Sequence, residues 1–162
     1  MSKRRLIFMI LSLIWMVVIF CFSSRDADES EKDSYKVGLT VGKIVIPDFE
    51  EKSEVEQLEF AQKIDHPVRK AAHATEYAIL GMLLVGVFYP MGKLGLLLPF
   101  ILSALYAVTD EIHQVFVPGR DGNATDVMID SSGALIGVLI LFIIISLKKK
   151  ITKKPQDISS EL

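Results

Sequence analysis

The sequence predicts an all-α polytopic membrane protein, in which four transmembrane helices are joined by turns and one long polar loop. Apolar residues make up 51% of the 162 residues and the mean hydropathy is +0.40, which is high for a soluble protein. They are concentrated in four segments whose lengths match bilayer-spanning helices: 6–22, 71–89, 94–117 and 127–147. A chain of this length holds one domain, so we expect a single membrane domain over 1–162.

The first apolar segment, 6–22, follows a short basic run. The run consists of Lys3, Arg4 and Arg5. A cleaved signal peptide begins in the same way, but this apolar core is long, contains Trp15 and is not followed by small residues at alternate positions. We therefore favour an uncleaved helix.

The single cysteine, Cys21, excludes an internal disulfide. The bulky Phe22 after it disfavours lipoprotein processing, so we interpret Cys21 as a lipid-facing or core residue.

A polar, acidic loop over 24–65 separates the first two apolar segments. Apolar residues recur at helical spacing in two parts of it, on either side of Pro47. The first part holds Val37, Val41, Ile44 and Val45, and the second holds Val55, Leu58, Ala61 and Ile64. We predict short amphipathic helices here that lie on the membrane surface or cap the bundle.

Two turns connect the remaining apolar segments. Pro90–Lys93 joins the second segment to the third, and Pro118–Asn123 joins the third to the fourth. Both connections are short, so the last three helices run antiparallel to their neighbours. Gly133 and Gly137 give the last helix a small-xxx-small face, which allows close helix contact in lipid.

Four spans place both termini on one side of the membrane, which we predict to be the cytoplasm. Each side then carries nine basic residues, so the count alone does not decide, and the inverted topology stays open. The bases on the terminal side, however, are clustered next to the first helix and in the tail, 148–162. Clusters that flank the first helix usually dominate orientation.

This threading brings ionisable residues from three apolar segments to the same, outer end of the bundle. Asp110, His113 and Gln114 share one helical face, whereas Glu111 points about 100° away from Asp110 and is not required to share its cavity. We predict a polar centre formed by His73, Glu76, Asp110, His113 and Asp126. Ligand-binding residues are expected around it: Arg69, Lys70, Tyr77, Glu111, Gln114, Arg120 and Asp130. Ionisable groups at hydrocarbon borders are expensive unless they are paired, hydrated or used.

Structural roles compete with function at these positions. Interhelical salt bridges are the alternative for His73, Glu76, Asp110 and His113. Arg69 and Lys70 can extend to lipid headgroups, and Tyr77 can be an interfacial aromatic residue. Asp126 can cap the N-terminus of the last helix, with Thr125 as the alternative cap.

Two blocks of the sequence carry a resemblance to a known family. The first block holds Arg69, Lys70, His73, Glu76, Tyr77, Leu80 and Gly81. The second holds Asp110, Glu111, His113, Gln114, Phe116, Pro118, Gly119 and Arg120, followed by Thr125, Asp126, Val127 and Gly133. Together with Phe22-Ser23-Ser24, they resemble the VanZ-like family of bacterial membrane proteins. Asp130 departs from the pattern, because many members carry asparagine there; the aspartate adds a charge or shares a proton.

The resemblance implies a four-helix, multi-pass protein of the bacterial cell membrane. The family is named for a protein linked to low-level teicoplanin resistance, so it implies a cell-envelope role without specifying a reaction. The chain resembles the broader family rather than the resistance protein itself.

Two functions from different classes are compatible with the polar centre. The first is a non-enzymatic envelope protein that binds an anionic envelope lipid or a glycopeptide, with Arg120 suited to bidentate anion recognition. The second is a membrane-embedded hydrolase or transferase that uses acid–base or divalent-metal chemistry. The candidate metal ligands are His73, Glu76, Asp110 and His113, which suit zinc, manganese or iron.

Two other classes fit less well. A transport pathway is weaker, because Gly81–Tyr89 and Leu94–Val108 offer no ionisable relay to the opposite end. Nucleic acid is not an expected partner, since no basic patch is interleaved with aromatic residues. The lipid bilayer is the expected partner.

Overall fold

A computed structural model describes residues 1–153, and its regular structure is entirely helical in this part of the chain. The helices are α1 (Lys3–Ser23), α2 (Ala27–Val45), α3 (Glu54–Phe88), α4 (Leu94–Gln114) and α5 (Ala124–Lys153), with 3₁₀ turns η1 (Phe49–Glu51) and η2 (Tyr89–Met91). Four of them are long and apolar enough to cross a membrane: Lys3–Ser23, Glu54–Met91, Leu94–Gln114 and Ala124–Lys149. The predicted all-α membrane fold is therefore confirmed.

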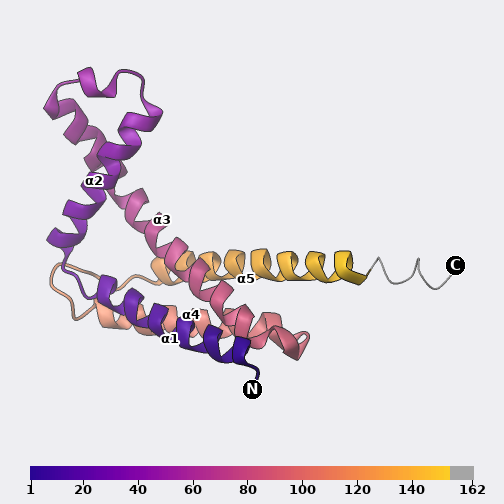
Figure 1. The fold of residues 1–162 in the computed structure, drawn as a ribbon. Coiled ribbons are helices and arrows are strands. Elements are labelled where there is room, and N and C mark those ends of the chain that lie inside the picture. The colour runs from indigo at the N-terminus through magenta and orange to yellow at the C-terminus, as the bar shows by residue number, and fades with distance from the viewer. Residues whose placement is uncertain (154–162) are drawn as a thin grey trace, which may run out of the picture.

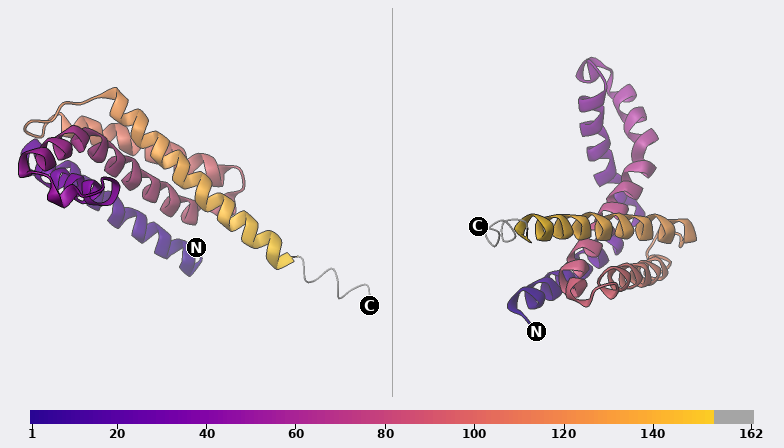
Figure 2. Two further views of the ribbon diagram at one scale, coloured as in Figure 1. Left: turned by 90° about the horizontal axis from the view of Figure 1, so that it is seen from above. Right: turned by 90° about the vertical axis from the view of Figure 1, so that its right-hand side faces the viewer.

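The helices form a bundle and a hairpin. α1, α4, α5 and the second half of α3 make the bundle (Figure 1). α2 and the first half of α3 make a helical hairpin, which projects to one side at the end where α1 ends and α5 begins (Figures 1 and 2). α3 therefore belongs to both parts and connects the hairpin directly to the membrane region.

The helix boundaries correct the sequence prediction mainly at α3. The predicted helix began at residue 71, but α3 begins at Glu54 and continues through Pro67 for 35 residues. A capping box starts it: the Ser53 hydroxyl accepts a hydrogen bond from Glu56 N–H, and the Glu56 carboxylate accepts one from Ser53 N–H. The predicted second amphipathic helix is thus the first half of α3. α4 ends at Gln114 instead of 117, and α5 runs from Ala124 instead of 127.

Small residues hold the hairpin together. A Cβ atom on Gly38 would lie 3.0 Å from Ala61 Cα, and one on Gly42 would lie 2.4 Å from the Phe49 ring. The apolar residues that predicted these helices mostly face outward; the exposed ones are Val37, Ile44, Val45, Val55 and Leu58. Their stripe is therefore free to contact the membrane surface, while Gly38 packs against α3 and Gly42 against the Phe49 ring of η1.

Glycines also bring α3 and α5 into backbone contact. A Cβ atom on Gly133 would lie 2.1 Å from Ala74 O, and one on Gly137 would lie 1.9 Å from Ala78 O. This confirms the predicted small-xxx-small face. Asp130, one turn before Gly133, is carried into the interior by the same face and is buried.

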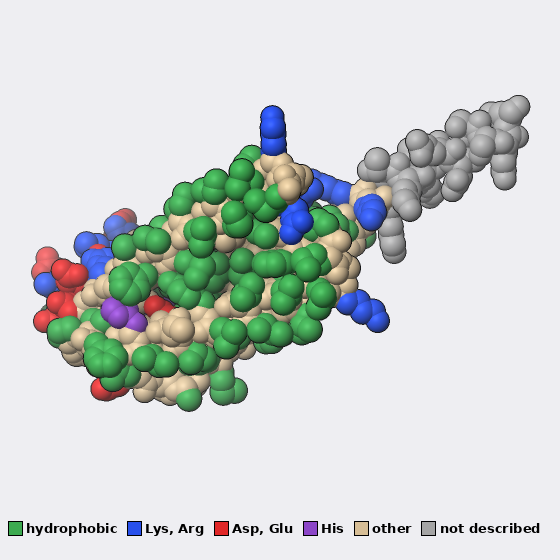
Figure 3. Space-filling view, turned by 90° about the horizontal axis from the view of Figure 1, so that it is seen from below, with side chains coloured by type: hydrophobic (Ala, Val, Ile, Leu, Met, Phe, Trp, Pro, Cys, Tyr) green, Lys and Arg blue, Asp and Glu red, His purple; other side chains and the backbone are tan. Residues whose placement is uncertain are grey.

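Hydrophobic side chains cover the middle of the bundle and charged ones lie at its ends (Figure 3). Arg5 Nε donates to Val87 O at 3.0 Å, and the rings of Tyr89 and Phe142 are 5.8 Å apart, so the start of α1 and the later turns of α5 lie at the same end. This basic end carries Lys3, Arg4, Arg5, Lys93, Lys148 and Lys149. We call the opposite end the polar end. The predicted basic tail begins inside α5, which runs to Lys153, and its remainder from Lys154 lies outside the described residues.

Candidate functional site

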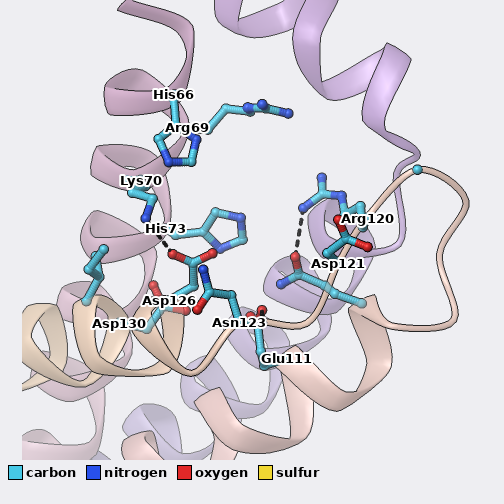
Figure 4. Close-up of a pocket in the computed structure, with 13 residues that line it drawn as sticks. His66, Arg69, Lys70, His73, Glu111, Arg120, Asp121, Asn123, Asp126 and Asp130 are labelled. Atoms are coloured by element: carbon cyan, nitrogen blue, oxygen red, sulfur yellow. Dashed lines mark hydrogen bonds and ion pairs between the residues drawn. The ribbon is translucent and has the colours of Figure 1, made fainter.

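A cavity of about 280 Å³ opens at the polar end between α3, α5 and the α4–α5 loop (Figure 4). It is lined by His66, Arg69, Lys70, His73, Glu111, Gln114, Gly119, Arg120, Asp121, Asn123, Asp126, Ile129 and Asp130. We call it the polar cavity. Twelve of these thirteen residues are not hydrophobic, which is unusual for a ligand pocket of a soluble protein, where hydrophobic side chains predominate.

Helical periodicity places the α3 residues on one wall. His66, Arg69, Lys70 and His73 follow one another at i, i+3, i+4 and i+7, which is a single helical face. His73 projects from α3 toward Arg120, which comes from the loop on the opposite side of the cavity (Figure 4). Two of these bases, Arg69 and Lys70, are each paired with a carboxylate.

The first of these pairs is Arg69 with Asp65, one turn earlier on α3, at 2.9 Å between Nη2 and Oδ2. The other oxygen of Asp65 accepts a hydrogen bond from the Ser34 hydroxyl of α2, so this pair also ties the hairpin together. The second pair joins Lys70 Nζ to Asp126 Oδ1 across α3 and α5, at 2.8 Å. Asp126 therefore links α5 to α3 through its ion pair with Lys70.

Asp126 is not the helix cap that the sequence offered as its alternative role. Asn123 takes that position, because its side-chain oxygen accepts a hydrogen bond from Thr125 N–H at 2.9 Å. Glu111, on α4, accepts a short hydrogen bond of 2.6 Å from Asn123 N–H. The α4–α5 loop is thus fastened to the cavity at Asn123.

Arg120 differs from the other bases because it has no carboxylate partner within residues 1–153. Its guanidinium donates to three neutral acceptors: Arg25 O at 3.0 Å, Gln114 Oε1 at 3.0 Å and the Ser30 hydroxyl. Burial, followed by repulsion from Arg69, lowers the pKa of Arg120 from its usual value. An arginine nevertheless stays protonated at neutral pH, so a positive charge remains here without a direct counter-charge.

A second cavity, of about 290 Å³, adjoins the polar cavity and reaches the space between α1, α2 and α3. Arg69, His73 and Arg120 line both cavities and so form the wall between them. The rest of the second cavity includes apolar side chains from these three helices: Phe22, Val37, Val68 and Ala72. We call it the side cavity. Glu76 also lines it, one turn below His73.

Asp110 lies at the centre of a buried hydrogen-bond network below the cavities. Its Oδ2 accepts from the Ser23 hydroxyl at 2.8 Å and from Gln114 Nε2 at 3.2 Å. Gln114 then accepts from Arg120 through its Oε1 at 3.0 Å. The network therefore runs from α1 through α4 to the α4–α5 loop.

The structure groups two residues of the predicted polar centre, His73 and Asp110, with Asp130, which was predicted to lie around it. One ligand atom each of His73, Asp110 and Asp130 lies within 4.8 Å of the other two. Tyr77 is fully buried near Asp110, so it is not an interfacial residue. Glu111 lines the polar cavity even though it points away from Asp110, because the α4–α5 loop folds back over it.

His113 lies apart from this group. It packs against α1, where its ring stacks on Phe20 with 4.4 Å between centroids, and its Nε2 is 3.0 Å from the Ser24 hydroxyl. Sequence reasoning missed Ser23, Ser30 and Asp65, and also three residues that line the polar cavity: His66, Asp121 and Asn123. The Phe22-Ser23-Ser24 exit was the only available signal for Ser23, and Ser30 and Asp65 had none.

Comparison with known proteins agrees with this architecture. The family model described as VanZ/LLP1 matches residues 8–145, which span α1 to α5 and contain every side chain of the site. No curated protein and no solved structure matches the chain. Most of the sequence is covered by the match, and it includes both the four membrane-spanning helices and the buried polar network. The chain is therefore a member of the VanZ/LLP1 family.

Proposed function

We propose that this protein binds the anionic headgroup of an envelope lipid at its polar end and thereby contributes to low-level teicoplanin resistance. Membership of the VanZ family fits an envelope membrane protein linked to that resistance. The observation that carries the proposal is Arg120, a half-buried guanidinium that lines both cavities and lacks a carboxylate partner within residues 1–153. Two of its five N–H donors are left for a ligand.

The two cavities together suit an amphiphile. A phosphate or carboxylate headgroup in the polar cavity would receive charge-assisted hydrogen bonds from Arg120. An attached chain would continue past Arg69 and His73 into the side cavity, where Phe22 and Val37 are available. At about 280 Å³, the polar cavity is slightly smaller than the usual range of ligand-pocket volumes, roughly 300–1,000 Å³. It therefore favours a headgroup over a whole glycopeptide.

The distribution of charge supports an outward-facing site. The basic end carries no acidic residue among the described residues, because every acid within residues 1–153 lies between Asp26 and Glu76 or between Asp110 and Asp130. Clustered bases beside the first and last membrane helices favour the cytoplasm. The polar cavity would then open to the outer leaflet, which the drug and its envelope target can reach.

The direct test is retention of a labelled, phosphate-bearing envelope lipid by the purified full-length protein. Arg120→Gln should weaken binding about ten- to a hundredfold, because it removes charge-assisted hydrogen bonds. Lys63→Gln is the matched control, since Lys63 is an exposed base on the hairpin and lines neither cavity. Equal lipid retention by wild type and Arg120→Gln contradicts the proposal, and binding of teicoplanin instead of lipid assigns the cavity to the drug.

Genetics tests the connection to resistance. Deletion of the gene should increase teicoplanin susceptibility, and wild-type and Lys63→Gln copies should restore the original level. A copy with Arg120→Gln should not restore it. Unchanged susceptibility after deletion removes the resistance role but leaves lipid binding to be judged by the retention assay.

A second candidate function, hydrolysis or group transfer on the same lipid, is favoured by one observation. His73 and Glu76 line the side cavity together with Arg69 and Arg120, and both are suitable for general acid–base work. Time-dependent release of a headgroup or phosphate by wild type, and not by Glu76→Gln, would support it. Intact lipid after prolonged incubation would leave binding alone.

A further inference from the structure

The buried centre of the bundle contains three ligand-type side chains that come from three different helices. His73 belongs to α3, Asp110 to α4 and Asp130 to α5. One nitrogen or oxygen atom from each lies within 4.8 Å of the other two. Neighbouring ligand atoms of a tetrahedral metal site are about 3.4 Å apart, since metal–nitrogen and metal–oxygen distances are close to 2.1 Å. Side-chain rotations that bring the three atoms closer together by up to about 1.4 Å would therefore give metal geometry.

Unpartnered polar atoms in this group point to a bound cation. Asp110 is 3% exposed and Asp130 2% exposed, yet the Oδ1 atom of each is buried and has no hydrogen-bond partner. The buried Nδ1 of His73 also lacks a hydrogen-bond partner. Buried polar atoms without partners are costly, and buried carboxylates are most costly of all. A single cation between them would satisfy all three side chains.

The charge in this region also lacks compensation. Asp65 and Asp126 are paired with Arg69 and Lys70. Within residues 1–153, Asp110 and Asp130 form no ion pair with an arginine or lysine. A divalent cation would neutralise these two carboxylates, which are too buried for water to stabilise their charge.

The hydrogen bonds of Asp110 are those expected of a metal-ligating carboxylate. Its Oδ2 is held by Ser23 and Gln114, whereas its Oδ1 has no hydrogen-bond partner. Ligating carboxylates are commonly oriented by outer hydrogen bonds of this kind. Gln114 is fixed in turn by Arg120, so the orientation of Asp110 is coupled to Arg120.

We infer that His73, Asp110 and Asp130 bind a divalent first-row transition-metal ion, with zinc and manganese as the ions best suited to one imidazole and two carboxylates. Three protein ligands leave a coordination position for water or for an oxygen of a ligand. His73 and Asp130 line the polar cavity, so that position would be reached from it. The set differs from the sequence prediction by including Asp130 and omitting His113 and Glu76.

The test is the metal content of the full-length protein, purified in detergent through a tag that does not bind metal. After equilibration with zinc or manganese and removal of free ions, we expect about one metal per chain. His73→Ala and Asp130→Asn should each lower the bound metal at least about tenfold. Asp130→Asn keeps the size of the side chain and so tests the site even where His73→Ala does not fold.

Matched controls separate ligation from a general loss of structure. His113→Ala removes the histidine that packs on α1, and Asp28→Asn removes an exposed carboxylate of α2; both should keep the full metal content. Added metal should also raise the thermal midpoint of wild type and not that of Asp130→Asn. Wild type without metal after equilibration with both ions, or full metal in both ligand variants, overturns the inference.

This inference does not rest on lipid binding. A protein that holds no metal but retains the labelled lipid would refute the metal site and leave the proposed function intact. A protein that holds metal but retains no lipid would refute the proposed function and leave the metal site intact.

Discussion

Gly137 of α5 lies directly against the carbonyl oxygen of Ala78 on α3, so that a Cβ atom on the glycine would be only 1.9 Å from it. No side chain can be accommodated there without moving the two helix backbones apart. The same contact recurs one turn earlier at Gly133 and Ala74. The position of Asp130 beside His73 therefore depends on glycine packing as much as on the polar residues themselves.

Gly137→Ala should destabilise the bundle, because the added methyl group meets backbone and not a flexible side chain. Overpacking of this kind costs about 1–3 kcal/mol or more. The measurement is the midpoint of unfolding in a denaturing detergent titration. Gly92→Ala is a comparison at a glycine with no atom nearby but a positive φ of 64°, so its cost comes from backbone strain alone. A Gly137→Ala protein as stable as wild type would mean that the helices are not in backbone contact.

The same substitution should also weaken the proposed metal site, although Gly137 touches none of its ligands. Separation of α5 from α3 moves Asp130 away from His73. We expect a lower metal content in Gly137→Ala than in Gly92→Ala after identical equilibration. Unchanged metal content with reduced stability would show that Asp130 keeps its place independently of the glycine contact.

The helical periods of the sequence predicted the glycine face but not the position of His113. Asp110 and Gln114 are one full turn apart and both enter the network, whereas His113, at i+3, is turned toward α1 and stacks on Phe20. Only the packing of α1 decides which edge of that face is interior. Because a sequence read helix by helix contains no information on how neighbours are rotated, both edges were equally good candidates.

The length of α3 was missed for a different physical reason. Hydropathy marks where a helix enters lipid, not where it begins, and the first half of α3 is polar. Ser53 and Glu56 form a recognisable capping signal well before the apolar segment. That signal, and not hydropathy, contained the true start. Serines such as Ser23 leave no comparable signal, since their role depends on a partner 87 residues away.

The ion pair between Arg25, just before α2, and Asp33 of α2 should make stability depend on pH. The Arg25 guanidinium, which donates a hydrogen bond to Asp33, lowers the pKa of that carboxyl below its usual value of 3.8. The stabilisation is therefore fully present above pH 3.8 and is lost as the pH falls through the lower, folded-state pKa. We expect Asp33→Asn to have a lower thermal midpoint than wild type at pH 6, and the difference to shrink below pH 3.8. Both side chains are solvent-accessible, so the effect should be small and sensitive to salt. A constant difference across this pH range would rule out the ion pair as its cause.

Thiol labelling should establish which end of the bundle faces outward. In a Cys21→Ser background, a single cysteine at Gln62 would lie on the exposed face of the hairpin, and one at Ser159 would lie in the C-terminal tail. Gln62 is preferable to Ser53, because the Ser53 side chain caps α3. We expect an impermeant reagent added to intact cells to label the cysteine at 62 and not the one at 159. Labelling only at 159 would invert the topology and place the polar cavity out of reach of an extracellular drug.

Ser23 should support the site through a single hydrogen bond. Its hydroxyl donates to Asp110 Oδ2 at 2.8 Å, and both residues are buried. Ser23→Ala leaves the carboxylate with one fewer donor, which should cost about 1–3 kcal/mol of unfolding free energy. Ser12→Ala is the matched control on the same helix, because the buried Ser12 hydroxyl donates only to Phe8 O, one turn earlier. If Asp110 is a metal ligand, Ser23→Ala should also lower metal affinity about ten- to a hundredfold, whereas Ser12→Ala should not change it. Equal losses of stability with no difference in metal affinity would show that Ser23 acts only in helix packing and that Asp110 is oriented by Gln114.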